Sequence, residues 1–148
     1  MKKKILFIGN SYTYYHDMPE RIFAPMAKEK GYDFEVQALT HGGYKLEWFA
    51  DPENEEGKRL RSVVEGRHYD CIVLQDHSLS TITDPAGVFG GIRSLKALLE
   101  DKTDKFVLIK KDDAGNWSVQ DYTIDAEGNV VVKTEKLGVF AIICDNFF

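Results

Sequence analysis

The stretch Lys4-Ile5-Leu6-Phe7-Ile8-Gly9-Asn10-Ser11 decides how this chain folds. Four consecutive apolar residues that end at a glycine are typical of a strand buried on both faces, as in a parallel sheet. The lysines at positions 2–4 give the start the look of a signal peptide. Its apolar run of four residues is shorter than the ~7–15 residues of a signal core, so we expect a first strand and a cytoplasmic protein.

Strands and helices alternate from this point to about residue 103. We expect apolar strands at 4–8, 33–39 and 70–74, a helix that Asp17 caps and Gly31 ends with a kink at Pro25, and helices at 57–65 and around Val88, Ile92, Leu95 and Leu99. Strands that alternate with amphipathic helices predict a parallel sheet with helices on both faces. Residues 1–103 are therefore expected to form an α/β three-layer sandwich around a parallel sheet.

The pattern changes in residues 104–148. Strands are expected at 106–109, 117–124, 130–133 and 137–143, with turns at 112–116 and 125–129. This pattern is typical of an antiparallel meander, and about 45 residues are too few to form a stable core alone. We expect this β extension to pack on the first region as one structural unit.

The composition is that of a globular protein with a mild negative charge. The 148 residues carry 19 basic and 24 acidic side chains, a net charge of 19 − 24 = −5, with 43% apolar residues. No basic stripe lies beyond residues 2–4, and no apolar run approaches the ~20 residues that span a bilayer, so neither nucleic acid nor membrane is an expected partner. Cys71 and Cys144 lie in apolar runs and are expected to be buried thiols.

Polar loops leave the carboxyl ends of the three predicted strands. They carry Gly9, Asn10, Ser11 and His16; then His41, Gly42 and Gly43; then Gln75, Asp76, His77 and Ser78. Ligands of open parallel sheets bind at this edge, so we expect the functional site here, whereas His68 precedes the third strand and lies at the other end. His16, His41 and His77 have no recognisable spacing for metal ligands, and no metal or cofactor is expected.

Three blocks of the sequence resemble those of the SGNH (GDSL-like) hydrolases over residues ~3–100. Residues 8–13, Ile-Gly-Asn-Ser-Tyr-Thr, are similar to the first block, Gly43 matches the second, and Gln75-Asp76 stands where the third has Gly-x-Asn-Asp. The resemblance implies a shortened three-layer sandwich of the SGNH/flavodoxin-like type. It also implies that Ser11 is a nucleophile for acyl esters and that the N–H groups of Ser11 and Gly43, with the side-chain amide of Gln75, stabilise the oxyanion.

The chain departs from the family at its catalytic base. That family carries an Asp-x-x-His motif near its C-terminus, and none of the four histidines here has Asp three positions earlier. The predicted substitute is His77, which follows a strand end beside Asp76. The expected substrate contacts are Asn10, Tyr12, His41, Gly42 and Asp76, and the expected substrate is a small ester or an acylated carbohydrate.

Three functions stay open at the level of sequence. The first is a serine esterase, impaired or inactive because the usual base is missing. The second is a non-catalytic ligand- or carbohydrate-binding protein with Trp117 and Tyr122 as stacking surfaces, and the third is a flavodoxin-like phosphate or nucleotide binder on the loop after Gly9. Tyr12, Tyr14 and Tyr15 crowd that loop and make a phosphate site the least favoured. A truncated or fused family member and a homodimer are both compatible with the chain, whose tail resembles β-modules of bacterial surface proteins.

Overall fold

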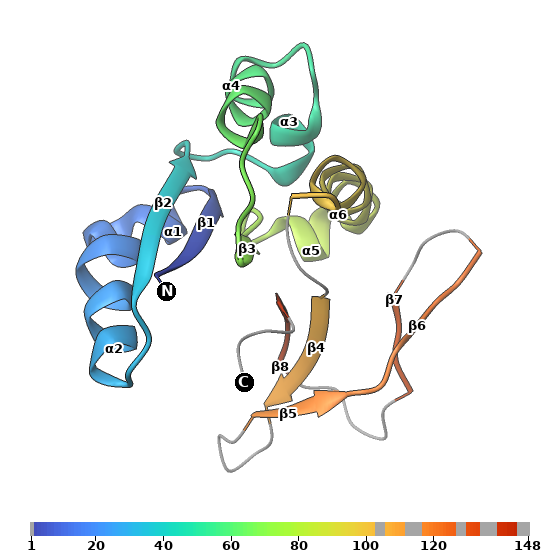
Figure 1. Ribbon diagram of the computed structural model, residues 1–148. Coiled ribbons are helices and arrows are strands. Elements are labelled where there is room, and N and C mark those ends of the chain that lie inside the picture. The colour runs from blue at the N-terminus through green and yellow to red at the C-terminus, as the bar shows by residue number, and fades with distance from the viewer. Residues whose placement is uncertain (1, 103–105, 112–116, 127–129, 134–138, 145–148) are drawn as a thin grey trace. The chain divides into compact units, whose positions relative to one another are not determined.

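The computed structural model describes residues 2–102, 106–111, 117–126, 130–133 and 139–144 (Figure 1). The chain forms two compact units, Met1–Thr103 and Asp104–Phe148. Unit 1 is a mixed α/β structure around a parallel sheet, and unit 2 is built from antiparallel strands. The α/β class predicted from the sequence is confirmed.

The sheet of unit 1 has β1 (Lys3–Gly9) at its centre. Strand β2 (Phe34–Thr40) pairs along its whole length, from Lys3 opposite Phe34 to Gly9 opposite Thr40. Strand β3 (Cys71–Leu74) pairs with β1 on the other side, and all three strands run parallel in the order β2-β1-β3. The three predicted strands are therefore confirmed to within one or two residues at each end.

Short and long helices connect these strands or follow the last of them. They are α1 (Ser11–Tyr14), the 3₁₀ turn η1 (Tyr15–Asp17), the π-helix η2 (Met18–Phe23), α2 (Ala24–Glu29), α3 (Leu46–Ala50), α4 (Glu55–Val64), α5 (Ser80–Thr83) and α6 (Pro85–Leu99). Helices α3 and α5 were not expected, because four or five residues carry too little periodicity to be recognised. The helix expected at 57–65 begins two residues earlier, where Asn54 accepts a hydrogen bond from the N–H of Glu56.

Helices cover both faces of the sheet. On one face the ring of Phe23 packs between those of Phe7 and Phe34, at centroid distances of 5.3 and 5.5 Å. On the other face lies the main core, which joins alternate sheet residues to helices α3, α4 and α6. Its buried members are Leu6, Ile8, Leu39, Leu46, Phe49, Leu60, Val64, Tyr69, Ile72, Leu95 and Leu99. Successive side chains of β1 point to opposite faces of the sheet, so this one strand contributes apolar side chains to both layers.

The helix after β1 begins differently from the expectation. Asp17 does not cap it: Asp17 and His16 both lie in the left-handed region, with φ of 52° and 57°, and the side chain of Asp17 forms no capping bond. The first helical residues, Met18–Phe23, form a π-helix, in which the N–H of Ala24 donates to the carbonyl of Pro19. The change to α-helix directly precedes Pro25, which has no N–H to continue the pattern of hydrogen bonds. The irregularity expected at Pro25 is thus spread over the preceding turn.

Unit 2 contains two small sheets. Strand β4 (Phe106–Lys111) lies between β5 (Trp117–Gln120) and β8 (Val139–Cys144), and all pairs are antiparallel. Strand β6 (Thr123–Ile124) pairs with β7 (Val130–Val131) as a separate hairpin. The single strand expected at 117–124 is therefore wrong, because the chain leaves the first sheet after Gln120. The predicted turn at 112–116 and the start of the last predicted strand at 137 lie outside the described residues.

No described helix combines the length and the apolar character needed to cross a membrane.

Candidate functional site

The loops that follow the three parallel strands are joined by backbone hydrogen bonds. The N–H of His41 donates to the carbonyl of Gly9 at 3.1 Å, and the N–H of Gln75 donates to the carbonyl of Ile8 at 2.9 Å. The parallel register therefore brings the starts of all three predicted loops to one edge of the sheet. This edge is the candidate functional site.

The buried side chain of Asn10 joins the loop after β1 to the loop after β2. Its side chain is 1% exposed, its Nδ2 donates to the carbonyl of Tyr44 at 2.9 Å, and its Oδ1 accepts from the N–H of Tyr12 at 3.2 Å. The second bond caps the short helix α1, which begins at Ser11. The expected contact of Asn10 with substrate stays a prediction, but the geometry gives this side chain the role of positioning Ser11.

Gln75 and Asp76 fix the third loop to the other two. Oε1 of Gln75 accepts from the N–H of Asn10 at 3.1 Å and from the hydroxyl of Thr13 at 2.9 Å, while its Nε2 donates to the carbonyl of Asp76. Oδ1 of Asp76 accepts from the N–H groups of Leu46 and His77. Both side chains are thus engaged within the protein, and their predicted contacts with an oxyanion or a substrate stay predictions.

Ser11 lies half-buried at the start of α1. Within the described part of the chain, its hydroxyl forms no hydrogen bond, and neither its N–H nor that of Gly43 donates one. Gly43 is exposed in a turn with φ of 74°, a conformation that suits glycine. Gly42 beside it lies against the Tyr14 hydroxyl, which would be 3.1 Å from a Cβ atom at this position. Two backbone donors and a hydroxyl are therefore available to a ligand.

The histidines have different surroundings. Nδ1 of His41 lies 3.1 Å from Oε1 of Glu56, and the imidazole packs on the ring of Tyr44 with a centroid distance of 3.9 Å. His77 is half-buried, and among the described residues its ring has no polar partner; His16 packs against a neighbouring tyrosine. No described imidazole is hydrogen-bonded to Ser11. His68 lies before β3, at the opposite end of the sheet, as expected.

Sequence reasoning missed Glu56 and Tyr44. Glu56 lies in α4, and its side chain is only 10% exposed although it carries a carboxylate. Its second oxygen lies 3.5 Å from Nη1 of Arg59. A buried carboxylate needs partners of this kind, and its pairing with His41 across 15 residues could not be inferred from spacing.

Three exposed tyrosines follow Ser11 in the sequence. Tyr12 and Tyr15 are about two-thirds exposed, at 66% and 65%, and Tyr14 is 42% exposed. These rings lie on α1 and η1, next to the two left-handed residues that precede the π-helix. Their exposure leaves them accessible to a ligand, and the expected contact of Tyr12 with substrate stays a prediction.

An ion pair joins the second loop to helix α6. Nζ of Lys45 lies 3.2 Å from Oδ2 of Asp84 and 3.4 Å from Oε1 of Glu47. The hydrogen bond with Asp84 raises the pKa of Lys45, against a smaller opposing effect of burial. The pKa of Asp84 is lowered, first by the N–H of Gly87 and then by Lys45. This pair helps to fix the loop that carries Gly43.

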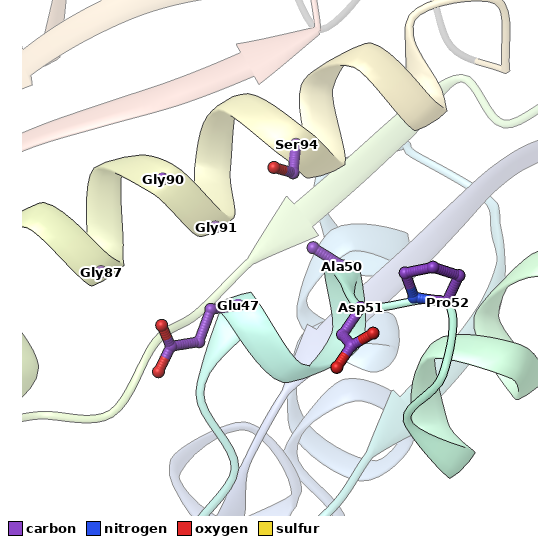
Figure 2. A pocket seen from close by; sticks show the side chains of 8 residues that line it. All are labelled: Glu47, Ala50, Asp51, Pro52, Gly87, Gly90, Gly91 and Ser94. Atoms are coloured by element: carbon purple, nitrogen blue, oxygen red, sulfur yellow. The ribbon is translucent and has the colours of Figure 1, made fainter.

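A shallow pocket of about 280 Å³ lies elsewhere, between α3 and α6 (Figure 2). It is lined by Glu47, Ala50, Asp51, Pro52, Gly87, Gly90, Gly91 and Ser94. The helices approach closely beside it, since a Cβ atom at Gly91 would lie 2.6 Å from the backbone nitrogen of Glu47. None of the predicted site residues lines this pocket. The small side chains of α6 explain why a hollow forms here.

Metal-ligand clusters are not found in the part of the chain that the structure describes. No three His, Cys, Asp or Glu side chains there are grouped to hold an ion, and His16, His41 and His77 form no such group.

No protein-family model matches this chain, and no curated protein matches it in sequence. Among solved structures, it is similar to a protein from Slackia heliotrinireducens described as "a putative SGNH hydrolase", with a TM-score of 0.59 and 22% identity. The match covers 70% of this chain and 54% of that protein, so the chain spans about half of its length. At this identity the likeness shows the fold alone: the chain shares its α/β fold with a protein that is described as an SGNH hydrolase.

Proposed function

We propose that this chain is a serine hydrolase of the SGNH type that acts on small acyl esters or acylated carbohydrates, with Ser11 as the nucleophile. The observation that carries the proposal is the state of Ser11. Its hydroxyl has no hydrogen-bond partner among the described residues, at the ligand-binding edge of a sheet whose loops are tied together beneath it.

The N–H groups of Ser11 and Gly43 are proposed to stabilise the oxyanion. Such a site needs donors that are unpaired before the substrate arrives and are held in place by the protein. Both N–H groups lack an acceptor in the described chain, and the Ser11 N–H is positioned by the buried side chain of Asn10. Gln75 supports the site through Asn10 and Thr13, and its role as a third donor stays a prediction.

In the proposed reaction the oxygen of Ser11 attacks the ester carbonyl and forms a tetrahedral intermediate. Collapse of this intermediate expels the alcohol and leaves an acyl-serine, which water then hydrolyses to the carboxylic acid. Substrate contacts are expected from the exposed Tyr12 ring and from the backbone of Gly42.

The test is covalent labelling of the 148-residue chain with a fluorophosphonate, read by intact mass and peptide mapping. We expect one adduct, on Ser11, and turnover of p-nitrophenyl acetate that is lost in Ser11→Ala. Ser62→Ala is a matched control, because Ser62 is an exposed serine on α4. Absence of an adduct on Ser11, together with equal turnover by wild type and Ser11→Ala, would overturn the proposal.

A second candidate is a binding protein that has kept the site without turnover. The observation that favours it is the absence of a hydrogen bond between Ser11 and any described imidazole. A hydroxyl without a base is a poor nucleophile. The labelling experiment separates the candidates, because a binding protein leaves the probe unreacted.

A further inference from the structure

His41 is held in a fixed orientation by two contacts. Its Nδ1 lies 3.1 Å from Oε1 of Glu56, and its ring lies against that of Tyr44. The side chain is nevertheless 47% exposed, whereas that of Glu56 is 10% exposed. A buried carboxylate thus orients an imidazole that remains open to solvent and to ligands.

The pair with Glu56 determines which nitrogen of His41 can accept a proton. An ionised carboxylate only accepts hydrogen bonds, so the neutral imidazole carries its proton on Nδ1 and donates it to Glu56. Nε2 is then the unprotonated nitrogen, and among the described residues it has no hydrogen-bond partner. This is the arrangement in which an imidazole acts as a general base.

A chain of contacts connects His41 to the neighbour of Ser11. The N–H of His41 donates to the carbonyl of Gly9, two residues before Ser11. Tyr44, on which the imidazole packs, receives a hydrogen bond on its carbonyl from the side chain of Asn10. Because Asn10 also caps the helix that begins at Ser11, one buried amide fixes the backbone on both sides of the site.

We propose that His41, oriented by Glu56, is the general base that activates Ser11. The inference rests on the proposed hydrolase function and adds its missing component. It places the base on the loop after β2, in the order Ser11, His41, Glu56 along the chain.

The proton balance of the proposed reaction is as follows. As the Ser11 oxygen bonds to the ester carbonyl carbon, its proton moves to Nε2 of His41, directly or through one water molecule. His41 then gives this proton to the departing alkoxide as the carbon–oxygen bond of the ester breaks. In the second half, water transfers a proton to His41 and attacks the acyl-serine, and the proton returns to the Ser11 oxygen as the acid leaves.

His41 meets these requirements better than His77. Asp76, the acidic neighbour of His77, uses its Oδ1 to accept from two backbone N–H groups, of Leu46 and of His77 itself. The His77 ring has no carboxylate partner among the described residues that would fix its tautomer. His41 has such a partner.

The test compares His41→Gln, Glu56→Gln and His77→Gln in the full chain, by kcat/KM for p-nitrophenyl acetate between pH 5 and 9. We expect His41→Gln to lower kcat/KM by about 10²–10⁴-fold and to abolish the acidic limb of the pH profile. Glu56→Gln should lower kcat by about tenfold or more while leaving KM nearly unchanged, because the imidazole loses the carboxylate that fixes its tautomer. Added imidazole should restore turnover to His41→Ala.

The matched control is His68→Gln, a change to an exposed histidine at the opposite end of the sheet, which should leave turnover unchanged. Circular dichroism of each variant separates loss of folding from loss of chemistry. If Ser11→Ala abolishes turnover while His41→Gln retains it, or if only His77→Gln removes it, the role of His41 is overturned and the hydrolase proposal stands. If Ser11→Ala is without effect on turnover and Ser11 is not labelled, the hydrolase proposal itself fails.

Discussion

Nδ2 of Asn10 donates a hydrogen bond of 2.9 Å to the carbonyl oxygen of Tyr44, across 34 residues of sequence. This bond joins the loop after β1 to the loop after β2, and it is made by a side chain that solvent hardly reaches. The relative position of these two loops at the candidate site therefore depends on a buried side chain.

Replacing Asn10 by alanine should destabilise the protein more than removing an ordinary helix cap. The change leaves the Tyr44 carbonyl and the Tyr12 N–H without their partners, and we expect a loss of about 2–3 kcal/mol in the free energy of unfolding. Asn54→Ala, which removes only the cap of α4, should cost about 1 kcal/mol. Urea unfolding followed by circular dichroism gives both values, and equal losses would contradict the bridging role of Asn10.

Gly9 should not tolerate alanine. A Cβ atom there would lie 2.3 Å from the Thr13 hydroxyl and 2.9 Å from Oε1 of Gln75, so Gly9→Ala would displace the bond between these side chains. We expect a loss of about 1–3 kcal/mol in the free energy of unfolding.

A double-mutant cycle shows whether the clash with Thr13 causes the destabilisation by Gly9→Ala. In a Thr13→Ala background the closest atom is gone, so Gly9→Ala should cost less there than in the wild type. Additive effects of the two changes would show that the strain arises elsewhere.

Two adjacent glycines of α6 should respond in opposite ways to alanine. A Cβ atom at Gly91 would lie 2.6 Å from the backbone nitrogen of Glu47, and we expect Gly91→Ala to force α3 and α6 apart at a cost of about 1–3 kcal/mol. A Cβ atom at Gly90 meets nothing within 4 Å, so Gly90→Ala should stabilise the helix by up to about 1 kcal/mol. Thermal unfolding of the two variants checks the order, and stabilisation by both would show that the helices are not in close contact.

Acid should weaken the fold partly through Asp84. Its pKa is lowered in the folded protein by the Gly87 N–H and by Lys45, so its ionised form is the one that stabilises the fold. This contribution is present above the pKa of the unfolded chain, about 3.9, and is lost as the pH falls below about 4 through the lower folded-state pKa. The urea midpoint of wild type should therefore fall more steeply between pH 6 and 3 than that of Asp84→Asn.

Asp33→Asn is the matched control for this measurement. The Asp33 side chain is exposed and makes no hydrogen bond or ion pair with the described residues, so its loss should leave the acid dependence unchanged. If the urea midpoint became equally less dependent on pH in both variants, the loss of stability in acid could not be assigned to Asp84.

The strands of unit 1 and their parallel arrangement could be predicted because they depend on local patterns. The apolar run before Gly9 and the runs ending at Leu39 and Leu74 each show a buried strand, and helices between them require a parallel sheet. The same reasoning brought the loops at 9–11, 41–43 and 75–77 to one edge, where the backbone hydrogen bonds now place their starts.

The pairing of side chains within these loops could not be predicted. Glu56 lies in the first turn of α4, where an acidic residue is expected for its effect on the helix alone, and only the packing of the helix turns it toward His41. The π-helix after Asp17 is another example. Two left-handed residues precede it and Pro25 follows it, and each of these features separately is compatible with an ordinary helix start.

The central strand β1 precedes both of its partner strands in the sequence, and this has a consequence for folding. Its apolar residues have no neighbouring strand until β2 at residues 34–40 and β3 at residues 71–74 have been synthesised. Strands this far apart in sequence can pair only after a long loop has closed. The entropy of that loop is lost before the strand contacts stabilise the chain, which makes folding slow. During synthesis one edge of β1 can pair once β2 has been made, whereas its other edge stays unpaired, and open to aggregation, until β3 follows.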